Sequence, residues 1–258
     1  MSELIELESA LARAAELLKK ADRVAVLTGA GVSAESGVPT FRASDGLWEG
    51  HRIEDVATPM GFQRDPALVW QFYNARRVNA RTVQPNPGHF ALAKLGEHWG
   101  ENFTLATQNV DGLHQRAGST NVLELHGSLR RTRCTGCEVT VDRGLESLGD
   151  LPACPTCSAM LRPDIVWFHE PLNDAIWGAA QAAAAMCDVL LVVGTSAVVY
   201  PAAQMIPLAK DRRFERTSPA NVIEFNLAKT EASRLADVGI YGPSGETLPK
   251  LLERLGDA

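Results

Sequence analysis

The chain has 258 residues, which is long enough for one large α/β domain and a small additional domain. Its hydrophobic fraction of 45% and charged fraction of 22% are ordinary for a globular protein, and a net charge of −6 gives no general attraction to nucleic acid. Glu3, Glu6 and Glu8 stand where a signal peptide carries basic residues, and free cysteines without an export signal indicate a reducing cytoplasm.

Short apolar runs alternate with helical segments along the chain. Leu4, Leu11 and Leu18 recur at helical spacing and predict an N-terminal helix. Further helices are expected at 67–81, 175–186 and 246–255, and buried strands at 24–27, 103–106, 122–125, 165–168, 189–193 and 222–225. The stretch 189–209 is uncharged and long enough to span a membrane, but Gly194 and Pro201 divide it into a strand, a turn and a short helix. Strands that alternate with helices predict an α/β fold with a doubly wound, Rossmann-like parallel sheet.

Two segments interrupt this alternation. Residues 43–83 form a polar loop followed by a helix, and residues 129–162 hold four cysteines. We expect the two segments to pack together as a small helical and zinc-ribbon domain. Residues 1–42, 84–128 and 163–258 would then form the dinucleotide-binding domain, with a cleft between the two domains for ligands.

A glycine turn follows the first predicted strand. Gly29-Ala30-Gly31 begins a G-x-G-x-x-A pattern whose backbone can approach a pyrophosphate closely. A tight turn without a ligand is the alternative at this point. The acidic residue that dehydrogenases place about twenty residues later is missing. The loop Pro39-Thr40-Phe41-Arg42 follows instead, so we expect a loop that covers the nucleotide and a reaction that consumes NAD without hydride transfer.

Polar side chains follow two more of the predicted strands. Gln108, Asn109 and Asp111 come after the strand at 103–106, and His126 comes after the strand at 122–125. The carboxyl ends of parallel strands line the crevice of a doubly wound sheet, so these groups should converge. A histidine alone at a strand end is more often structural, but beside this polar set His126 is favoured as a general base.

Four of the five cysteines form two C-x-x-C pairs, Cys134 with Cys137 and Cys154 with Cys157, separated by sixteen residues. This spacing is typical of a zinc ribbon, in which four thiolates surround Zn²⁺ and leave no position for substrate. We therefore predict a structural zinc. Unrelated buried thiols or two disulfides remain alternatives, whereas a catalytic dithiol is disfavoured because neither pair follows a strand and opens a helix. Cys187, among alanines, is expected in the core.

Three arginines, Arg130, Arg131 and Arg133, lie beside the cysteine segment. A zinc ribbon with basic residues can bind nucleic acid, but no aromatic residues are interleaved here. We expect a solvated strand edge, with a local patch for an acidic partner as the alternative.

Taken together, these motifs resemble the sirtuins, the class III NAD-dependent protein lysine deacylases. The similar segments, in the family's order, are 29–37 with Phe41-Arg42, 107–114, His126-Gly127, the four cysteines, 194–196, 226–227 and 242–245. They extend across nearly the whole chain.

The resemblance implies an NAD site, a catalytic set and a reaction. The implied NAD-binding residues are Gly29, Ala30, Gly31, Ser33, Ala34, Glu35, Phe41, Arg42, Trp48, Gln108, Asn109, Asp111, Gly194, Thr195, Ser196, Asn226, Leu227 and Ser244. The implied catalytic residues are His126, Asn109 and Asp111, with His126 accepting a proton from a ribose hydroxyl. In sirtuins the acyl group passes from lysine to ADP-ribose as nicotinamide is released.

The resemblance also implies an acyl preference. Tyr73 and Arg76 lie three residues apart on a predicted helix, and together they resemble the sirtuin branch that removes succinyl and malonyl groups. Ala57 resembles a small residue that widens the acyl pocket of that branch. An amphipathic helix with solvated arginines is the alternative. The segment Val166, Trp167 and Phe168 resembles the one that pairs with the substrate peptide, although His169 replaces the family's usual glycine.

Several functions remain open at this point. The leading hypothesis is a desuccinylase and demalonylase that also removes acetyl groups; the alternatives are mainly a deacetylase, or a mono-ADP-ribosyltransferase. A non-enzymatic NAD sensor or zinc-ribbon binding module is disfavoured, because NAD binding alone needs no base at the ribose. We expect acylated-lysine proteins as substrates and neither a specific nucleic acid nor a membrane as partner; no oligomer is implied.

Overall fold

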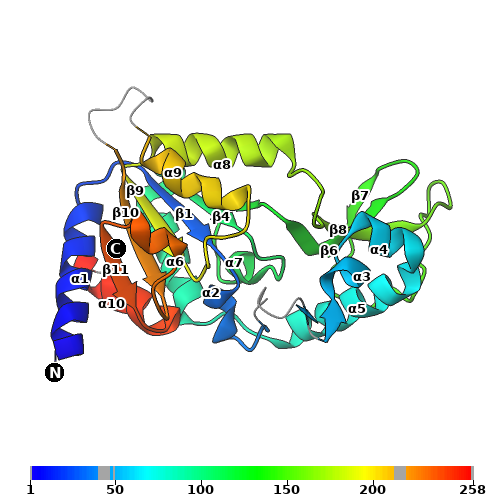
Figure 1. Cartoon of the computed structure of the whole chain (residues 1–258), viewed down its shortest axis with the longest axis horizontal. Coiled ribbons are helices and arrows are strands. Elements are labelled where there is room, and N and C mark those ends of the chain that lie inside the picture. The colour runs from blue at the N-terminus through cyan, green and yellow to red at the C-terminus, as the bar shows by residue number, and fades with distance from the viewer. Residues whose placement is uncertain (1, 40–46, 49, 212–218, 257–258) are drawn as a thin grey trace.

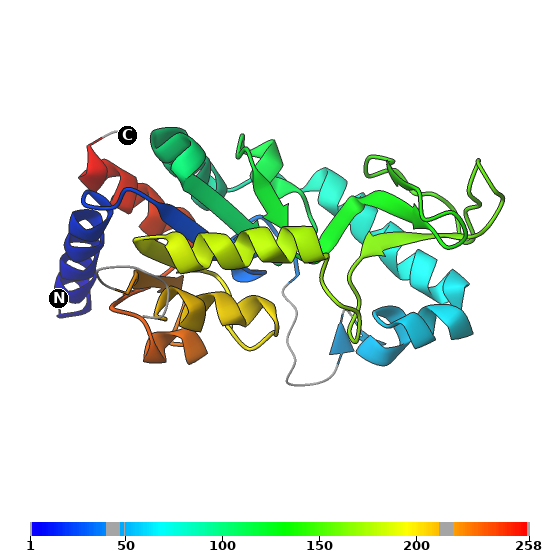
Figure 2. The same cartoon turned by 90° about the horizontal axis from the view of Figure 1, so that it is seen from above.

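The computed structural model describes residues 2–39, 47–48, 50–211 and 219–256, which fold into a larger and a smaller part (Figures 1 and 2). The larger part contains a six-stranded sheet with the order β11-β10-β9-β1-β4-β5. Its strands are β1 (Val24–Thr28), β4 (Phe103–Thr107), β5 (Val122–Glu124), β9 (Val189–Val193), β10 (Asn221–Asn226) and β11 (Val238–Tyr241). All of its neighbouring strands are parallel, which confirms the predicted Rossmann-like fold.

Helices cover both faces of this sheet. Along β1, Val24 and Val26 pack into one core, whereas Ala25 and Leu27 pack into the other, as the two-residue period of a strand requires. The first core includes residues of α1 (Ser2–Leu18), α6 (Pro87–Trp99) and α10 (Ser244–Leu255), and the second includes residues of α8 (Asp174–Met186) and α9 (Met205–Ala209). The strands are therefore buried on both faces, which explains their continuous apolar sequences.

The order of the strands reverses at β1, which has β4 on one side and β9 on the other. The loops after β1 and β9 meet there, and the Gly31 N–H donates to the Gly194 carbonyl at 2.7 Å. A Cβ on Gly31 would lie 2.7 Å from that oxygen, and Gly194 has a φ of +59°, so both positions require glycine. In open α/β sheets the ligand crevice lies at this reversal.

The smaller part combines the two interrupting segments. Its antiparallel sheet has the order β7-β6-β8, formed by β6 (Gly127–Cys134), β7 (Thr140–Asp142) and β8 (Leu161–Ile165). Beside it lie α3 (Ile53–Val56), α4 (Pro59–Arg64), α5 (Pro66–Thr82) and a ribbon of β2 (Leu47–Trp48) and β3 (His51–Arg52). Val69 and Tyr73 of α5 share a core with Leu129 and Trp167. This core joins residues of the predicted segments 43–83 and 129–162, together with Trp167, which lies outside both ranges.

Two sequence predictions about strands are wrong. Residues 165–168 do not form a strand of the large sheet: β8 ends at Ile165 and belongs to the small one. Nor is β6 an edge strand of solvated arginines, because it lies between β7 and β8. Arg131 forms ion pairs with Glu124 and Asp164, so its charge is partly neutralised within the protein.

The remaining elements are short. They are α2 (Gly31–Ala34), α7 (Leu113–Arg116), η1 (Gly100–Asn102), η2 (Ala202–Gln204) and η3 (Glu231–Arg234). The uncharged stretch 189–209 contains β9, η2 and α9, as predicted. Across the described residues, no helix combines the length and the apolar character needed to cross a membrane.

Candidate active site and metal centre

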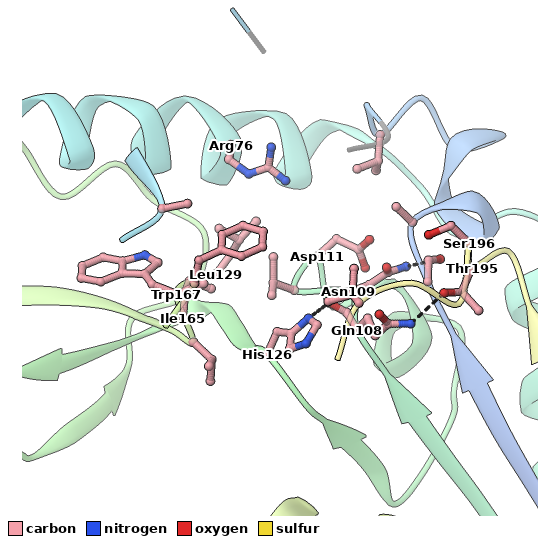
Figure 3. Close-up of a pocket in the computed structure, with 18 of the residues that line it drawn as sticks. Arg76, Gln108, Asn109, Asp111, His126, Leu129, Ile165, Trp167, Thr195 and Ser196 are labelled. Atoms are coloured by element: carbon pink, nitrogen blue, oxygen red, sulfur yellow. Dashed lines mark hydrogen bonds between the residues drawn. The ribbon is translucent and has the colours of Figure 1, made fainter. Parts of the chain in front are cut away.

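A cleft of about 440 Å³ is lined by residues of both parts. It brings together 17 of the site residues predicted from the sequence: Gly29, Ala30, Gly31, Ala57, Tyr73, Arg76, Gln108, Asn109, Asp111, His126, Val166, Trp167, Phe168, Gly194, Thr195, Ser196 and Asn226. In Figure 3, Arg76 extends from α5 on the opposite side of the cleft from His126. Residues from the glycine turn and from the acyl-pocket prediction thus share one cavity.

His126 lies in the two-residue connection between β5 and β6, with its ring in the cleft. Its Nδ1 is 3.1 Å from the Gln108 carbonyl oxygen (Figure 3). A carbonyl can only accept, so Nδ1 carries the hydrogen and Nε2 keeps a lone pair. Burial lowers the pKa of His126, which keeps the imidazole neutral near pH 7. The ring is therefore poised as a base.

A buried chain of hydrogen bonds lies beneath the glycine turn. His89 accepts the Asn86 N–H at Nδ1, so its Nε2–H donates to Ser33 Oγ at 3.3 Å. Ser33 in turn donates to Asp111 Oδ2 at 2.8 Å, and Asn109 Nδ2 donates to Ser33 Oγ at 3.0 Å. Burial lowers the pKa of His89 to about 4 and raises the pKa of Asp111. The chain fixes Asn109 and Asp111 at the cleft wall.

Side chains also tie the strand ends to one another. Gln108 Nε2 donates to Thr195 Oγ1 at 2.9 Å, and Asn226 Nδ2 donates to the Thr195 carbonyl at 2.9 Å. These bonds join the loops after β4, β9 and β10 into one polar rim. Such a rim suits a ligand with many hydroxyl and phosphate oxygens.

The other end of the cleft holds Tyr73 and Arg76. Both lie on one face of α5 and are largely buried, so the alternative of an amphipathic helix with solvated arginines does not hold for Arg76. The Trp167 indole donates to Tyr73 Oη at 3.0 Å, which leaves the phenol O–H able to donate to another group. Burial raises the pKa of Tyr73 to about 12, so that hydrogen is retained at neutral pH.

The four predicted cysteines converge at the far end of the smaller part. All four Sγ atoms lie within 4.8 Å of one another, and the Cys134–Cys157 and Cys137–Cys154 pairs are 3.4 and 3.8 Å apart. These distances exclude disulfides and fit the roughly 3.8 Å between sulfurs of a tetrahedral Zn²⁺ site with Zn–S bonds of about 2.3 Å.

Backbone N–H groups further favour thiolates at this centre. The Cys137 and Gly136 N–H groups donate to Cys134 Sγ at 3.4 and 3.3 Å, and they lower the pKa of that thiol to about 6. The cysteines therefore form a structural zinc site, with no protein ligand position left for a substrate.

Some predicted residues do not line the cleft. Ser33, Ala34, Glu35, Leu227 and Ser244 are outside the lining that the structure describes. Glu35 instead accepts hydrogen bonds from Ser244 Oγ and the Gly245 N–H, at 3.0 and 2.9 Å. Phe41, Arg42 and the side chain of Trp48 lie outside the described residues, as does part of the loop expected to cover the nucleotide.

The sequence reasoning missed His89, whose signal is the Asn86-Pro87-Gly88-His89 start of α6. The structure forms a capping box there, in which Asn86 and His89 satisfy each other's backbone N–H groups. It also missed the contact of Arg162 with Glu170, because a spacing of eight residues across a turn has no periodic signature.

The comparisons with known proteins agree with this geometry. The Sir2 family model matches residues 29–201. NAD-dependent protein deacylase 2 of Pyrobaculum aerophilum is 49% identical over 243 residues, with 93% of this chain and 94% of the relative covered. The NAD-dependent protein deacylase of Thermococcus kodakarensis is 46% identical, with 96% of each chain covered.

Solved structures are similar as well. The crystal structure of a Sir2 homolog–NAD complex matches with a TM-score of 0.86 and 41% identity, covering 94% of this chain and 93% of that one. The structure of Sir2Af2 bound to a myristoylated histone peptide matches with a TM-score of 0.76 and 36% identity, covering 96% and 97%.

Proposed function

Because this chain belongs to the Sir2 family and is an NAD-dependent protein lysine deacylase, we propose that it acts best on lysines that carry an acidic acyl group, such as succinyl or malonyl. Acetyl removal is a second activity in this proposal. The substrates of the reaction are acyl-lysine proteins and NAD.

The observation that carries the acyl preference is the pairing of Tyr73 and Arg76 in one buried end of the cleft. A guanidinium binds a carboxylate through two parallel N–H donors, and a phenol O–H adds a third hydrogen bond. Arg76 also supplies the positive charge there, since it lowers the pKa of both Tyr73 and Asp111, against the larger opposing effect of burial. Ala57 and Leu129 line the same cavity, and we take the space beside these apolar residues as an acyl passage between this pair and His126.

We assign His126 the role of general base. Its neutral ring and its Nε2 lone pair suit it to accept a proton from a hydroxyl in the cleft. Asn109 and Asp111 are assigned to the nicotinamide end, because both are buried and hydrogen bonds to Ser33 and Gly29 hold them in place. Immobilised dipoles of this kind stabilise developing charge without having to reorganise.

NAD supplies a leaving group, nicotinamide, and an ADP-ribose that takes the acyl group. We propose that the glycine turn at Gly29 and Gly31 holds the pyrophosphate, where no side chain blocks the backbone. Thr195, Ser196 and Asn226 would hold the adenosine end through the polar rim. Glu35 and Ser244, bonded to each other, would lie at the far end of the same site.

The peptide would bind along residues 166–168. The Val166 N–H donates to the His126 carbonyl and the Phe168 N–H to the Ala57 carbonyl, each at 3.0 Å. These bonds hold the segment between the base and the acyl passage. A substrate backbone would therefore lie along this segment as an added strand.

The test compares one peptide that carries acetyl-, succinyl- or malonyl-lysine, with nicotinamide release as the readout. We expect kcat/KM to be higher for succinyl than for acetyl, and Tyr73→Phe and Arg76→Met to lower the succinyl-to-acetyl ratio by about tenfold each. A wild-type enzyme that prefers acetyl would overturn the acyl assignment. If labelled ADP-ribose is found on protein, and not on the released acyl group, the ADP-ribosyltransferase alternative would be favoured.

Arg77→Met is the matched control for Arg76→Met. Arg77 is the next residue of the same helix, but it is absent from the described lining of the cleft and donates to the backbone carbonyls of Leu129, Gly144 and Glu146. We expect this variant to lose stability while it keeps the wild-type ratio. Because both substrates are measured on the same sample, the fraction of folded enzyme cancels in the ratio.

A further inference from the structure

A part-buried ion pair, Arg162 with Glu170, lies beside the acyl end of the cleft. Arg162 Nη1 and Nη2 contact Glu170 Oε1 and Oε2 at 2.6 and 2.8 Å, and the two side chains are only 11% and 17% exposed. Removing charges from water is costly, so an ion pair with little exposure is weak support for stability alone. Its contacts point to another role.

Both members of the pair hold Trp167. The Arg162 guanidinium carbon lies 3.6 Å from the centre of the indole ring, a close cation–π contact. Glu170 Oε2 accepts the Trp167 backbone N–H at 2.9 Å, and Arg162 Nη2 also donates to the Ile165 carbonyl at 3.0 Å. Trp167 is thus fixed at its backbone and on one face of its ring.

Trp167 in turn fixes Tyr73. An indole N–H can only donate, so the 3.0 Å contact from Trp167 Nε1 makes the phenol oxygen an acceptor. That bond restricts where the phenol can point its own O–H. Trp167 and Tyr73 both line the cleft, whereas Arg162 is absent from its described lining.

We propose that the Arg162–Glu170 ion pair determines acyl specificity by positioning Trp167, and through it the Tyr73 hydroxyl, for an acyl group that ends in a carboxylate. The inference rests on the proposed function. Arg162 is a positioning residue, since it acts through Trp167 without touching the substrate.

The charge of the pair supports the same role. Glu170 lines the cleft, and a bare carboxylate there would repel an acidic acyl group. Burial is the largest single effect and opposes its ionisation. The hydrogen bonds from Arg162 and from the Trp167 N–H, together with the charges of Arg162 and Arg133, outweigh burial and lower the pKa of Glu170. With Arg162 in place, the cleft keeps an ordered carboxylate whose charge is neutralised by its partner.

The experiment measures kcat/KM for succinyl- and acetyl-lysine forms of one peptide in Arg162→Met, Arg162→Lys and Glu170→Gln. We expect Arg162→Met to lower the succinyl-to-acetyl ratio by about tenfold, and Arg162→Lys by about threefold, because lysine keeps the charge but loses the planar two-point contact. Glu170→Gln should fall between wild type and Arg162→Met, since an amide oxygen can still accept the Trp167 N–H. Arg130→Met is the control, because it removes a more exposed ion pair with Asp142 from the same sheet.

A double variant separates positioning from general damage. If Arg162 acts through Tyr73, Arg162→Met should change the ratio little further in a Tyr73→Phe background. KM for NAD and zinc content should stay at wild-type values throughout. The ratio is unaffected by partial unfolding, so an unstable variant still gives an answer.

Three outcomes overturn the inference. A wild-type preference for succinyl that Tyr73→Phe removes but Arg162→Met leaves intact would refute the positioning role alone. Fully additive effects of the two substitutions would refute it as well. A wild-type preference for acetyl would refute the proposed function, and the inference with it.

Discussion

At the scale of single residues, His126 has the most direct connection to turnover. Its Nδ1–H is committed to the Gln108 carbonyl, so Nε2 is the only ring atom that can accept a proton. His126→Ala should lower kcat by about 10²–10⁴-fold, the usual contribution of a general base, while fold and zinc content are retained. Steady-state nicotinamide release measures the loss, and an unchanged kcat would remove His126 from this role.

The protonation of His126 also determines how kcat/KM should depend on pH. Only the neutral imidazole can act as a base, and burial lowers the pKa of His126. The neutral fraction therefore stays near one as pH falls and decreases only below the range of an exposed histidine. We expect the pH at which kcat/KM is half-maximal to lie below 6.5, the pKa of an ordinary histidine. A half-maximal value at or above pH 6.5 would contradict this assignment.

His169 has a backbone conformation that favours glycine. Its φ is +72°, and it is the third residue of a turn closed by the Glu170 N–H and the Trp167 carbonyl at 3.0 Å. Any side chain at such a position costs about 1–2 kcal/mol. His169→Gly should therefore be more stable than His169→Ala by about 1 kcal/mol, measured by chemical denaturation. Equal stability of the two variants would mean that the turn carries no strain.

At the level of residues, the sequence could predict which polar side chains converge in one cleft. Asn109, Asp111 and His126 were identifiable because parallel strands bring their carboxyl ends to one edge. The links between side chains were not identifiable. The contact between Ser33 and His89 joins residues 56 positions apart, and no local pattern encodes such a pair.

At the scale of elements, α5 connects the acyl end of the cleft to the metal-binding segment. Tyr73 and Arg76 face the cleft, whereas Arg77 is 1% exposed and donates to the carbonyls of Leu129, Gly144 and Glu146. One helix therefore presents adjacent arginines to two different environments. Its sequence period could predict the helix but not that both arginines are buried.

Arg77→Met tests this connection. The variant leaves three carbonyls without a donor, two of them only part-buried, so we expect a loss of about 2–4 kcal/mol in the free energy of unfolding. Burial lowers the pKa of Arg77 to about 10, so the guanidinium is still charged at pH 7 and its replacement also removes a charge. Thermal unfolding followed by circular dichroism gives the measurement, and a melting temperature within 1 °C of wild type would contradict it.

Element prediction failed where tertiary pairing decides the outcome. Residues 165–168 are apolar and resemble a buried strand, but three of their N–H groups donate to His126, Glu170 and Ala57 in an irregular segment. The position of β6 between β7 and β8 depends on which segments the zinc site brings together. Neither fact is contained in the period of hydrophobic residues.

At the scale of the whole molecule, the two parts have separate cores. The sheet packs around two clusters built from the helices on its faces, and the smaller part packs around Trp70, Tyr73 and the residues near the cysteines. Trp70 belongs to the same cluster as Cys134 and Cys154, and it lies one helical turn before Tyr73. Order at the metal centre is thus linked through α5 to the acyl end of the cleft, whereas the glycine turn belongs to the sheet.

This arrangement predicts that loss of the metal affects NAD binding much less than it affects the turnover of succinyl-lysine. Zinc binding is coupled to the folding of the segment that supplies its ligands, so Cys134→Ser or a strong chelator should unfold the smaller part first. Calorimetry should then show an early transition that is absent from the zinc-loaded protein. NAD affinity, measured by titration, should change by less than about threefold, while succinyl-lysine turnover is lost. Cys187→Ser is the matched control, because that cysteine is buried in the sheet's core and bonded to the Ala184 carbonyl, away from the metal. A single transition with simultaneous loss of NAD binding would mean that the two parts fold as one unit and that the metal supports the whole chain.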